Sequence, residues 1–300
     1  FFKDRYNINS AAGAQRHQQG LHWAYAKIST TIFSTCIRID GMFGCIGSGK
    51  SIVSLPALQF HSNHLLKIFV KITFRLLYFT FSISRMKYLQ IDQAFLLESG
   101  ESLNKIAIAY QTYGNLNSTK SNVVWVCHAL TANAAAEEWW PGLIGLGCAI
   151  DTNKYFVVCA NIMGSCYGST GPLSTNPDTG QPYYHSFPFI SIRDMVKAHQ
   201  LLAAHLGIQK IHLLMGGSMG GYQVLEWCCM QPEVIENIFV IASAARESAW
   251  GIAIHTAQRM AIESDCTWQN SDDKAGEMGL KTARAIGMVT YRSFATYAQA

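Results

Sequence analysis

A glycine-rich hexapeptide, residues 216–221, constrains the fold of this chain more than any other feature of the sequence. It places Ser218 in a G-x-S-x-G pattern between the apolar run 211–215, typical of a strand, and the helical stretch 222–230. Such a turn needs small neighbours so that the serine hydroxyl stands clear of the backbone, and glycine supplies that room. The amides at the start of the helix can then stabilise negative charge on an attacked carbonyl. We therefore predict that Ser218 is a nucleophile of acyl transfer; the alternative is a glycine-rich turn with a capping serine.

Residues 86–245 have the pattern of one domain in which strands and helices alternate. Residues 89–97 and 106–113 read as antiparallel strands joined by a turn at 98–101. Short runs rich in Val and Ile are expected to be parallel strands covered on both faces: 122–126, 155–160, 211–215 and 238–242. Residues 191–206 have the apolar spacing of a helix, which begins with a capping box of Ser191 and Asp194. This pattern predicts an α/β fold, with a mostly parallel sheet and helices on both of its faces.

A second loop, residues 127–132, follows the first of these parallel strands. In folds that carry G-x-S-x-G on such a turn, this kind of loop provides one donor of the oxyanion hole, and the residue after the serine provides the other. We therefore expect the backbone amides of Leu130 and Met219 to face the same oxygen. His128, in the same loop, is expected to be held by hydrogen bonds in a structural role rather than to take part in the chemistry.

Residues 86–300 resemble the homoserine O-acetyltransferase family, whose members have the α/β-hydrolase fold and act in methionine biosynthesis. The resemblance rests on motifs spread along the chain: 128–131, 139–142, Asn161 and Gly164 with 168–172, 191–195, 216–221 with Glu226 and Trp227, 243–246, and 290–293. It implies a core at 86–245, followed at 246–300 by the beginning of a helical lid that keeps water from the acyl-enzyme.

The same resemblance implies roles for individual residues. Ser218 is the acylated nucleophile, Leu130 and Met219 supply the oxyanion hole, and Arg284 and Tyr291 contact homoserine. An arginine suits this last role, because its planar guanidinium can grip a carboxylate through two charge-assisted hydrogen bonds. The resemblance further implies acetyl-CoA as a co-substrate, no bound cofactor, and a homodimer.

Residues 219–300 contain no aspartate and histidine in the order that a catalytic triad of this fold requires. In this fold the chain order is Ser, then Asp or Glu, then His, yet His255 is the only histidine after Ser218 and the later aspartates all follow it. Glu247 precedes His255, but both fall at the entrance of the expected lid. We therefore expect the catalytic aspartate and histidine to lie beyond Ala300. Three hypotheses remain: an acetyltransferase, a succinyltransferase or esterase-like hydrolase of the same fold, and an inactive fragment that lacks the two residues.

Residues 1–85 differ from the rest of the chain in charge and texture. They carry ten Lys or Arg against two Asp or Glu, whereas residues 86–300 carry 13 against 17. We expect residues 1–85 to be a leader or upstream translation outside the fold, with Met86 as the true start, or else a transit peptide. The apolar stretch 65–83 is interrupted by cations on one helical face, so we do not expect a membrane span. Residues 44–51 match the G-x-x-x-x-G-K-S phosphate loop, but without its strand and helix context.

The charge, cysteine and histidine patterns argue against nucleic-acid-binding, disulfide-stabilised and metal-binding proteins. The negative balance of residues 86–300 gives no support to nucleic-acid binding. Nine scattered cysteines predict no disulfide framework, and isolated histidines predict no metal site. With no cleavable signal peptide, these features predict a reducing, cytoplasmic location.

Overall fold

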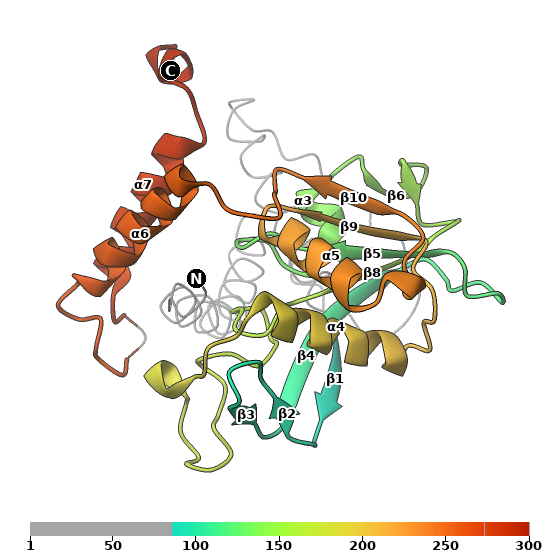
Figure 1. Cartoon of the computed structure of the whole chain (residues 1–300), viewed down its shortest axis with the longest axis horizontal. Helices are drawn as coiled ribbons and strands as arrows, with labels where there is room; N and C mark the ends of the chain where they lie inside the picture. Colours follow the sequence, from blue (N-terminus) through green and yellow to red (C-terminus); the bar gives the residue numbers. More distant parts are fainter. Residues whose placement is uncertain (1–85, 273, 300) are drawn as a thin grey trace, which may run out of the picture. The chain divides into compact units, whose positions relative to one another are not determined.

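The computed structural model describes residues 86–272 and 274–299. The expectations for residues 1–85, including the leader, the apolar stretch and the phosphate-loop match, lie outside these residues. Within the described part, the order of strands and helices follows the expected alternation, as Figure 1 shows.

A six-stranded sheet forms the centre of the fold, in the order β1-β4-β8-β5-β9-β10. Strand β5 (Val123–Cys127) pairs in parallel with β8 (Phe156–Ala160) and with β9 (Leu213–Gly217), and β9 pairs in parallel with β10 (Ile238–Ile241). The runs predicted as parallel strands are thus confirmed as strands. However, β9 begins two residues later than expected, and β10 is largely exposed rather than covered on both faces, because it is the last strand of the described sheet. Because parallel strands end at a common edge, the loops after β5 and β9 lie side by side.

The amino-terminal strands differ from the expectation in one respect. Strand β1 (Lys87–Ile91) pairs antiparallel with β4 (Ile106–Tyr113), as predicted, but it ends at Ile91. The expected turn instead joins a separate two-stranded sheet, β2 (Phe95–Leu96) with β3 (Ser102–Leu103). Phe95 and Leu103 turn into the core from this small sheet, and that burial explains why the apolar pattern seemed to continue.

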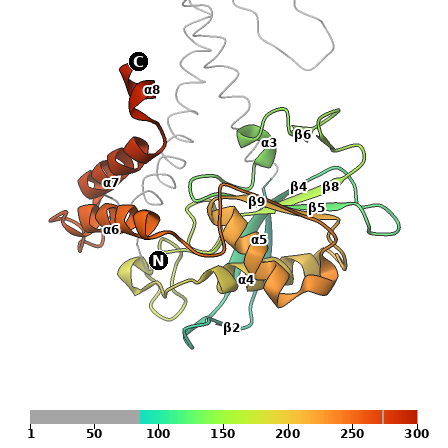
Figure 2. The same cartoon turned by 45° about the horizontal axis from the view of Figure 1, so that its top comes forward.

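Helices cover both faces of the sheet. Helices α4 (Ile192–His205) and α5 (Met219–Met230) lie together on one side of it in Figures 1 and 2. Trp125 points from β5 toward them and meets Trp227 edge-on, with 5.1 Å between the ring centroids. Val124 and Val126, which alternate with Trp125, pack in a second cluster with the residue that begins α3 (Ala136–Trp139).

The helix predicted at 191–206 is confirmed together with its capping box. The Ser191 side chain accepts a hydrogen bond from the Asp194 amide, and Asp194 accepts one from the Ser191 amide. Short elements complete the core: β6 (Ile144–Gly145), β7 (Ile150–Asp151), η1 (Tyr184–Ser186) and η2 (Pro232–Val234).

The segment after β10 is helical, as expected of a lid. It consists of α6 (Ala249–Glu263), α7 (Glu277–Thr290) and α8 (Phe294–Ala298). Helices α6 and α7 lie side by side in Figures 1 and 2, with a small cluster of Ile262, Trp268 and Ala283 buried between them. Among the described residues, no helix combines the length and the apolar character needed to cross a bilayer.

Candidate active site

Ser218 lies on a sharp turn between strand β9 and helix α5. Its φ of 53° and ψ of −121° put a non-glycine residue in a region that L side chains rarely adopt. Its backbone N–H donates to the carbonyl oxygen of Ile241 at 3.1 Å, which ties the turn to the neighbouring strand. Ser218 is exposed while Met219 and Gly220 after it are buried. The turn therefore presents the hydroxyl outward, as a nucleophile requires.

The glycines around Ser218 are required by close backbone contacts. A Cβ on Gly220 would overlap the carbonyl oxygen of Cys127, and a Cβ on Gly216 would overlap that of Gly220. A Cβ on Gly221 would meet the side chain of Ser243. The first turn of α5 thus packs directly against the end of β5, and this contact brings the loop after Cys127 next to the nucleophile.

The loop after β5 is held by a buried polar network centred on His128. Nδ1 of His128 donates to the Ala129 carbonyl at 2.8 Å, and Nε2 accepts from the Ile162 amide at 3.2 Å. The carbonyl of His128 itself accepts from Nε2 of Gln223, on α5, at 3.3 Å. His199, on α4, contacts the other end of the Gln223 amide at 2.9 Å. His128 is therefore held by hydrogen bonds, as expected, and its network joins the loop after β5 to helix α5 and to Ile162.

Burial keeps both histidines of this network neutral. Desolvation lowers the pKa of His128 and of His199 from near 6.5 to about 4, because neither ring is accessible to water that would stabilise its charge. In the unfolded chain both rings take up protons near pH 6.5, so the unfolded state binds more protons between pH 4 and 6.5. The contribution of these two neutral rings to the free energy of unfolding is therefore fully present above pH 6.5 and is lost as the pH falls toward 4.

We therefore expect the free energy of unfolding to fall on acidification by up to about 3 kcal/mol per pH unit from these two groups together. Urea unfolding at a series of pH values between 7 and 4.5 measures the slope. His128→Asn removes one of the two rings and should reduce the slope by about half. An unchanged slope in this variant would show that His128 does not titrate in this way.

Ser218 opens into a cavity of about 890 Å³ whose walls come from the core and from the lid helices. Leu130 and Met219, the expected oxyanion residues, line this cavity, and so do Arg284 from α7 and Tyr291, the residue that follows this helix. The four residues that sequence analysis assigned to the site along with Ser218 are thus brought together. Arg284, Gly287, Met288 and Tyr291 are spaced as one face of a helix, so α7 presents a continuous stripe to the cavity.

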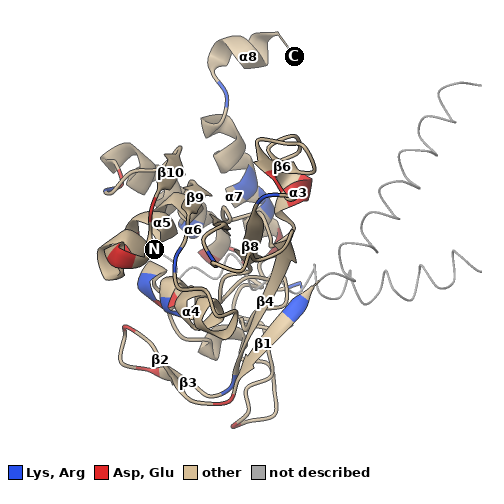
Figure 3. Cartoon of the chain, turned by 90° about the vertical axis from the view of Figure 1, so that its right-hand side faces the viewer, with Lys and Arg blue, Asp and Glu red and all other residues tan. Residues whose placement is uncertain are grey.

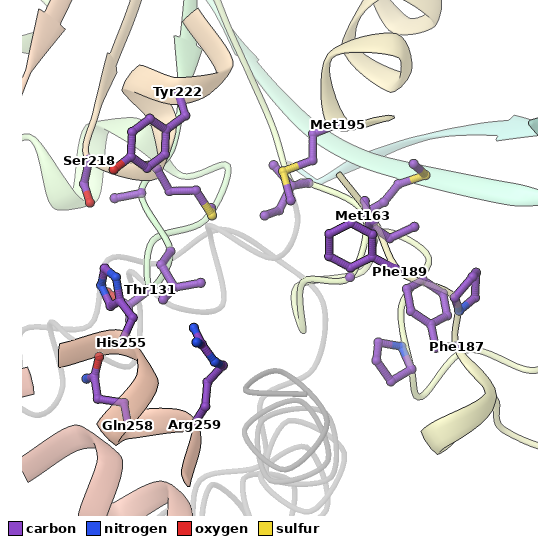
Figure 4. Close-up of a pocket in the computed structure, with 18 of the residues that line it drawn as sticks. Thr131, Met163, Phe187, Phe189, Met195, Ser218, Tyr222, His255, Gln258 and Arg259 are labelled. Atoms are coloured by element: carbon purple, nitrogen blue, oxygen red, sulfur yellow. The ribbon is translucent and has the colours of Figure 1, made fainter. Parts of the chain in front are cut away.

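Helix α6 adds polar residues that sequence analysis did not assign to the site. His255, Gln258 and Arg259 line the cavity, and Figure 4 shows His255 on the Ser218 side of it. The carboxylate of Glu247 pairs with Nδ1 of His255. Sequence analysis set this pair aside as part of the lid entrance; the structure places its histidine in the cavity of the nucleophile. The available signal was spacing, because positions 255, 258 and 259 share one helical face.

No group of three His, Cys, Asp or Glu side chains within residues 86–272 and 274–299 is arranged to hold an ion. Figure 3 shows Lys and Arg positions on several elements of the described chain. The cavity itself joins the exposed Ser218, the loop after β5 and Arg284 of α7.

A sequence model of the α/β-hydrolase fold matches residues 122–277, which span strands β5 to β10, the Ser218 turn and helix α6. This chain belongs to the α/β-hydrolase family. The fold class expected from the sequence is thereby confirmed, including the parallel sheet and the position of the serine turn.

Curated relatives of this α/β hydrolase include homoserine O-acetyltransferases. A homoserine O-acetyltransferase from Cyclobacterium marinum is 51% identical over 208 residues, which are 69% of this chain and 59% of the relative. A second, from Trichormus variabilis, is 45% identical over 223 residues, 73% of this chain and 62% of the relative. The chain thus spans about 60% of the length of the relatives it matches.

Solved structures with the same fold include both an acetyltransferase and an esterase. A homoserine O-acetyltransferase from Bacillus anthracis has a TM-score of 0.62 at 29% identity, covering 68% of this chain and 60% of that one. Esterase E22 has a TM-score of 0.66 at 28% identity, covering 71% of this α/β hydrolase and 63% of the esterase. The resemblance stated from the motifs is therefore confirmed, while the fold is shared by transferases and hydrolases.

Proposed function

We propose that the gene product containing this chain is a homoserine O-acetyltransferase, which moves the acetyl group of acetyl-CoA to the hydroxyl of L-homoserine. The observation that carries the proposal is the cavity lined by Ser218 on its turn together with Arg284 on α7 and Tyr291 directly after it. A serine nucleophile alone fits any acyl transfer or hydrolysis. The arginine adds a site for the carboxylate of an amino-acid acceptor.

The reaction proceeds in two halves through an ester on Ser218. In the first half a histidine base, expected beyond Ala300, takes the proton of the Ser218 hydroxyl as it attacks the thioester carbonyl, and the Leu130 and Met219 amides stabilise the oxyanion. The carbon–sulfur bond then breaks, and the base returns the proton to the sulfur, so CoA leaves as the thiol. In the second half the same base takes the proton of the homoserine hydroxyl as it attacks the acyl-Ser218 ester, and it returns that proton to the serine oxygen. The lid helices α6 and α7 wall the cavity and limit the access of water to the intermediate.

The acceptor role of Arg284 predicts a selective change in affinity. Arg284→Gln should raise the KM for homoserine by roughly 10- to 100-fold, the loss expected for a charge-assisted hydrogen-bonded pair of about 1.5–3 kcal/mol. The KM for acetyl-CoA should change little. Arg292→Gln, which removes an exposed arginine near the end of the same helix and outside the cavity lining, is the matched control. Equal effects of the two substitutions would remove Arg284 from acceptor binding.

A panel of donors and acceptors tests the activity itself. The complete gene product is mixed with acetyl-CoA or succinyl-CoA and with homoserine or serine, and free CoA thiol and the O-acyl product are measured. We expect product with acetyl-CoA and homoserine, and little CoA release without the acceptor. CoA release that does not depend on homoserine would assign the site to hydrolysis, the second candidate, which the structural similarity to esterase E22 favours.

The homodimer and the cytoplasmic location implied for the family are part of the proposal. Trp250 and Phe294 of the lid are 72% and 89% exposed, which supports an association of lids between two copies. The described cysteines are all free thiols, which supports a reducing compartment.

A further inference from the structure

We propose that His128 is a positioning residue of the oxyanion hole, which aims the Leu130 amide by holding the peptide group that carries it. The inference rests on the proposed function, because it concerns the same acyl transfer at Ser218. It goes further by assigning a task to a buried histidine that touches no substrate.

The peptide between Ala129 and Leu130 carries both groups of interest. Its carbonyl oxygen belongs to Ala129, and its N–H belongs to Leu130. A trans peptide is planar, with the C=O and the N–H pointing in opposite directions. Whatever fixes the carbonyl on one side of the loop therefore fixes the direction of the N–H on the other side.

His128 holds this carbonyl from the buried side. Nδ1 of His128 lies 2.8 Å from the Ala129 oxygen, and the Ala132 amide donates to the same oxygen at 3.0 Å. His128 is fully buried whereas Leu130 is 42% exposed and lines the cavity. His128 thus donates from the core, and the Ala132 amide closes the turn 129–132 on the same oxygen, so the Leu130 end of the peptide is directed away from the core. Both donors also polarise the Leu130 N–H.

The tautomer of His128 is determined by its partners. The Ile162 amide donates to Nε2 at 3.2 Å, so Nε2 must be an acceptor without a proton. The proton of the neutral ring therefore sits on Nδ1, where it can be donated to the Ala129 carbonyl. The Ile162 contact thus keeps His128 in the one form that can position the peptide.

Gln223 extends the same alignment to the second half of the hole. Its Nε2 donates to the carbonyls of His128 and Met219, each at 3.3 Å, and so joins the loop to the first turn of α5. Because both carbonyls need donors, the Gln223 oxygen must face His199, whose Nε2 then donates to it at 2.9 Å. The residues that flank the two expected oxyanion amides are therefore linked by one side chain.

Three substitutions at position 128 separate positioning from stability. His128→Asn keeps a donor near the position of Nδ1 but loses the acceptor for Ile162. His128→Gln can reach the position of Nε2 with an acceptor but loses the donor to Ala129. His128→Leu removes both. The readout is the rate of Ser218 acylation by p-nitrophenyl acetate in the complete gene product, with the melting temperature measured in parallel.

If His128 positions the peptide, His128→Gln and His128→Leu should acylate Ser218 roughly 10- to 100-fold more slowly, somewhat less than the loss of a whole oxyanion donor. His128→Asn should keep most of the rate even where it melts lower than His128→Gln. Gln223→Met should also slow acylation, whereas Gln231→Met, which removes a side-chain acceptor of Trp227 at the far end of α5, should not.

A rate that follows the melting temperature across the three variants, or a His128→Asn enzyme as slow as His128→Leu, would overturn the proposal. The acylation assay contains no homoserine, so it judges the oxyanion hole even if the acceptor panel were to reject the acetyltransferase activity. The two proposals can therefore fail separately.

Discussion

Ser218→Ala is expected to lower the rate of acetyl transfer by about 10⁴- to 10⁶-fold, the loss seen when a serine nucleophile is removed from a site whose oxyanion hole remains. The reason is that no other described hydroxyl stands on the turn between β9 and α5, next to the Met219 amide that is expected to stabilise the oxyanion. Substrate affinity should survive, because the cavity walls are otherwise unchanged. Stopped-time assays of CoA release, with homoserine titrated in parallel, measure both quantities.

Ser186→Ala is the matched control for this substitution. Ser186 also lines the cavity and is exposed, but its hydroxyl donates to the Tyr183 carbonyl on η1. We expect its rate to stay within about threefold of the parent, as for a surface change away from the chemistry. Comparable losses in the two variants would mean that Ser218 has no special part in the reaction.

Gly220→Ala is expected to damage both the fold and the site. Its Cβ would overlap the Cys127 carbonyl, which is backbone and has no rotamer by which to move away. Overpacking of this kind costs typically about 1–3 kcal/mol, against a gain of at most about 1 kcal/mol from the helix propensity of alanine. To relieve the overlap, the loop after β5 must move away from α5 and take Leu130 with it, so acylation should fall about 100-fold.

Gly217→Ala provides the comparison, because Gly217 lies three positions earlier, at the end of β9 where the turn begins. Its Cβ would lie 3.3 Å from Cγ2 of Ile241, a side-chain atom that can shift. We expect a loss of stability below about 1.5 kcal/mol in urea unfolding and an acylation rate within about tenfold of the parent. If Gly220→Ala proved as stable and as active as Gly217→Ala, the close packing of α5 on β5 would not be what aligns the oxyanion loop.

The sequence predicted those features of the fold that depend on local pattern. Strands β5, β8, β9 and β10 were predicted because they are short Val- and Ile-rich runs, and α4 because its cap and its apolar spacing agree. The Ser218 turn was predicted because a G-x-S-x-G pattern between a strand and a helix is typical of a tight turn that presents a serine. By contrast, β1 was predicted too long, because Phe95 is buried by tertiary packing that continues the alternation of a strand.

The site was predicted only in part, since much of it is made by contacts between distant segments. Glu247 lies just before α6 and pairs with His255, eight residues later on that helix, and Gly251 between them has no side chain to separate them. Only the tertiary fold, however, brings His255 to the cavity of Ser218. Gln223 looks like an ordinary position on α5 until its partners on the loop and on α4 are known. Such links depend on tertiary structure, and sequence spacing does not reveal them.

The central claim is that acyl transfer passes through an ester on Ser218. The most direct measurement is mass spectrometry of the complete gene product after brief mixing with acetyl-CoA, followed by a chase with homoserine. We predict one added acetyl group on the peptide that contains Ser218, and its quantitative transfer to O-acetylhomoserine during the chase. Steady formation of O-acetylhomoserine by an enzyme that never carries acetyl on Ser218, or by Ser218→Ala, would contradict the account.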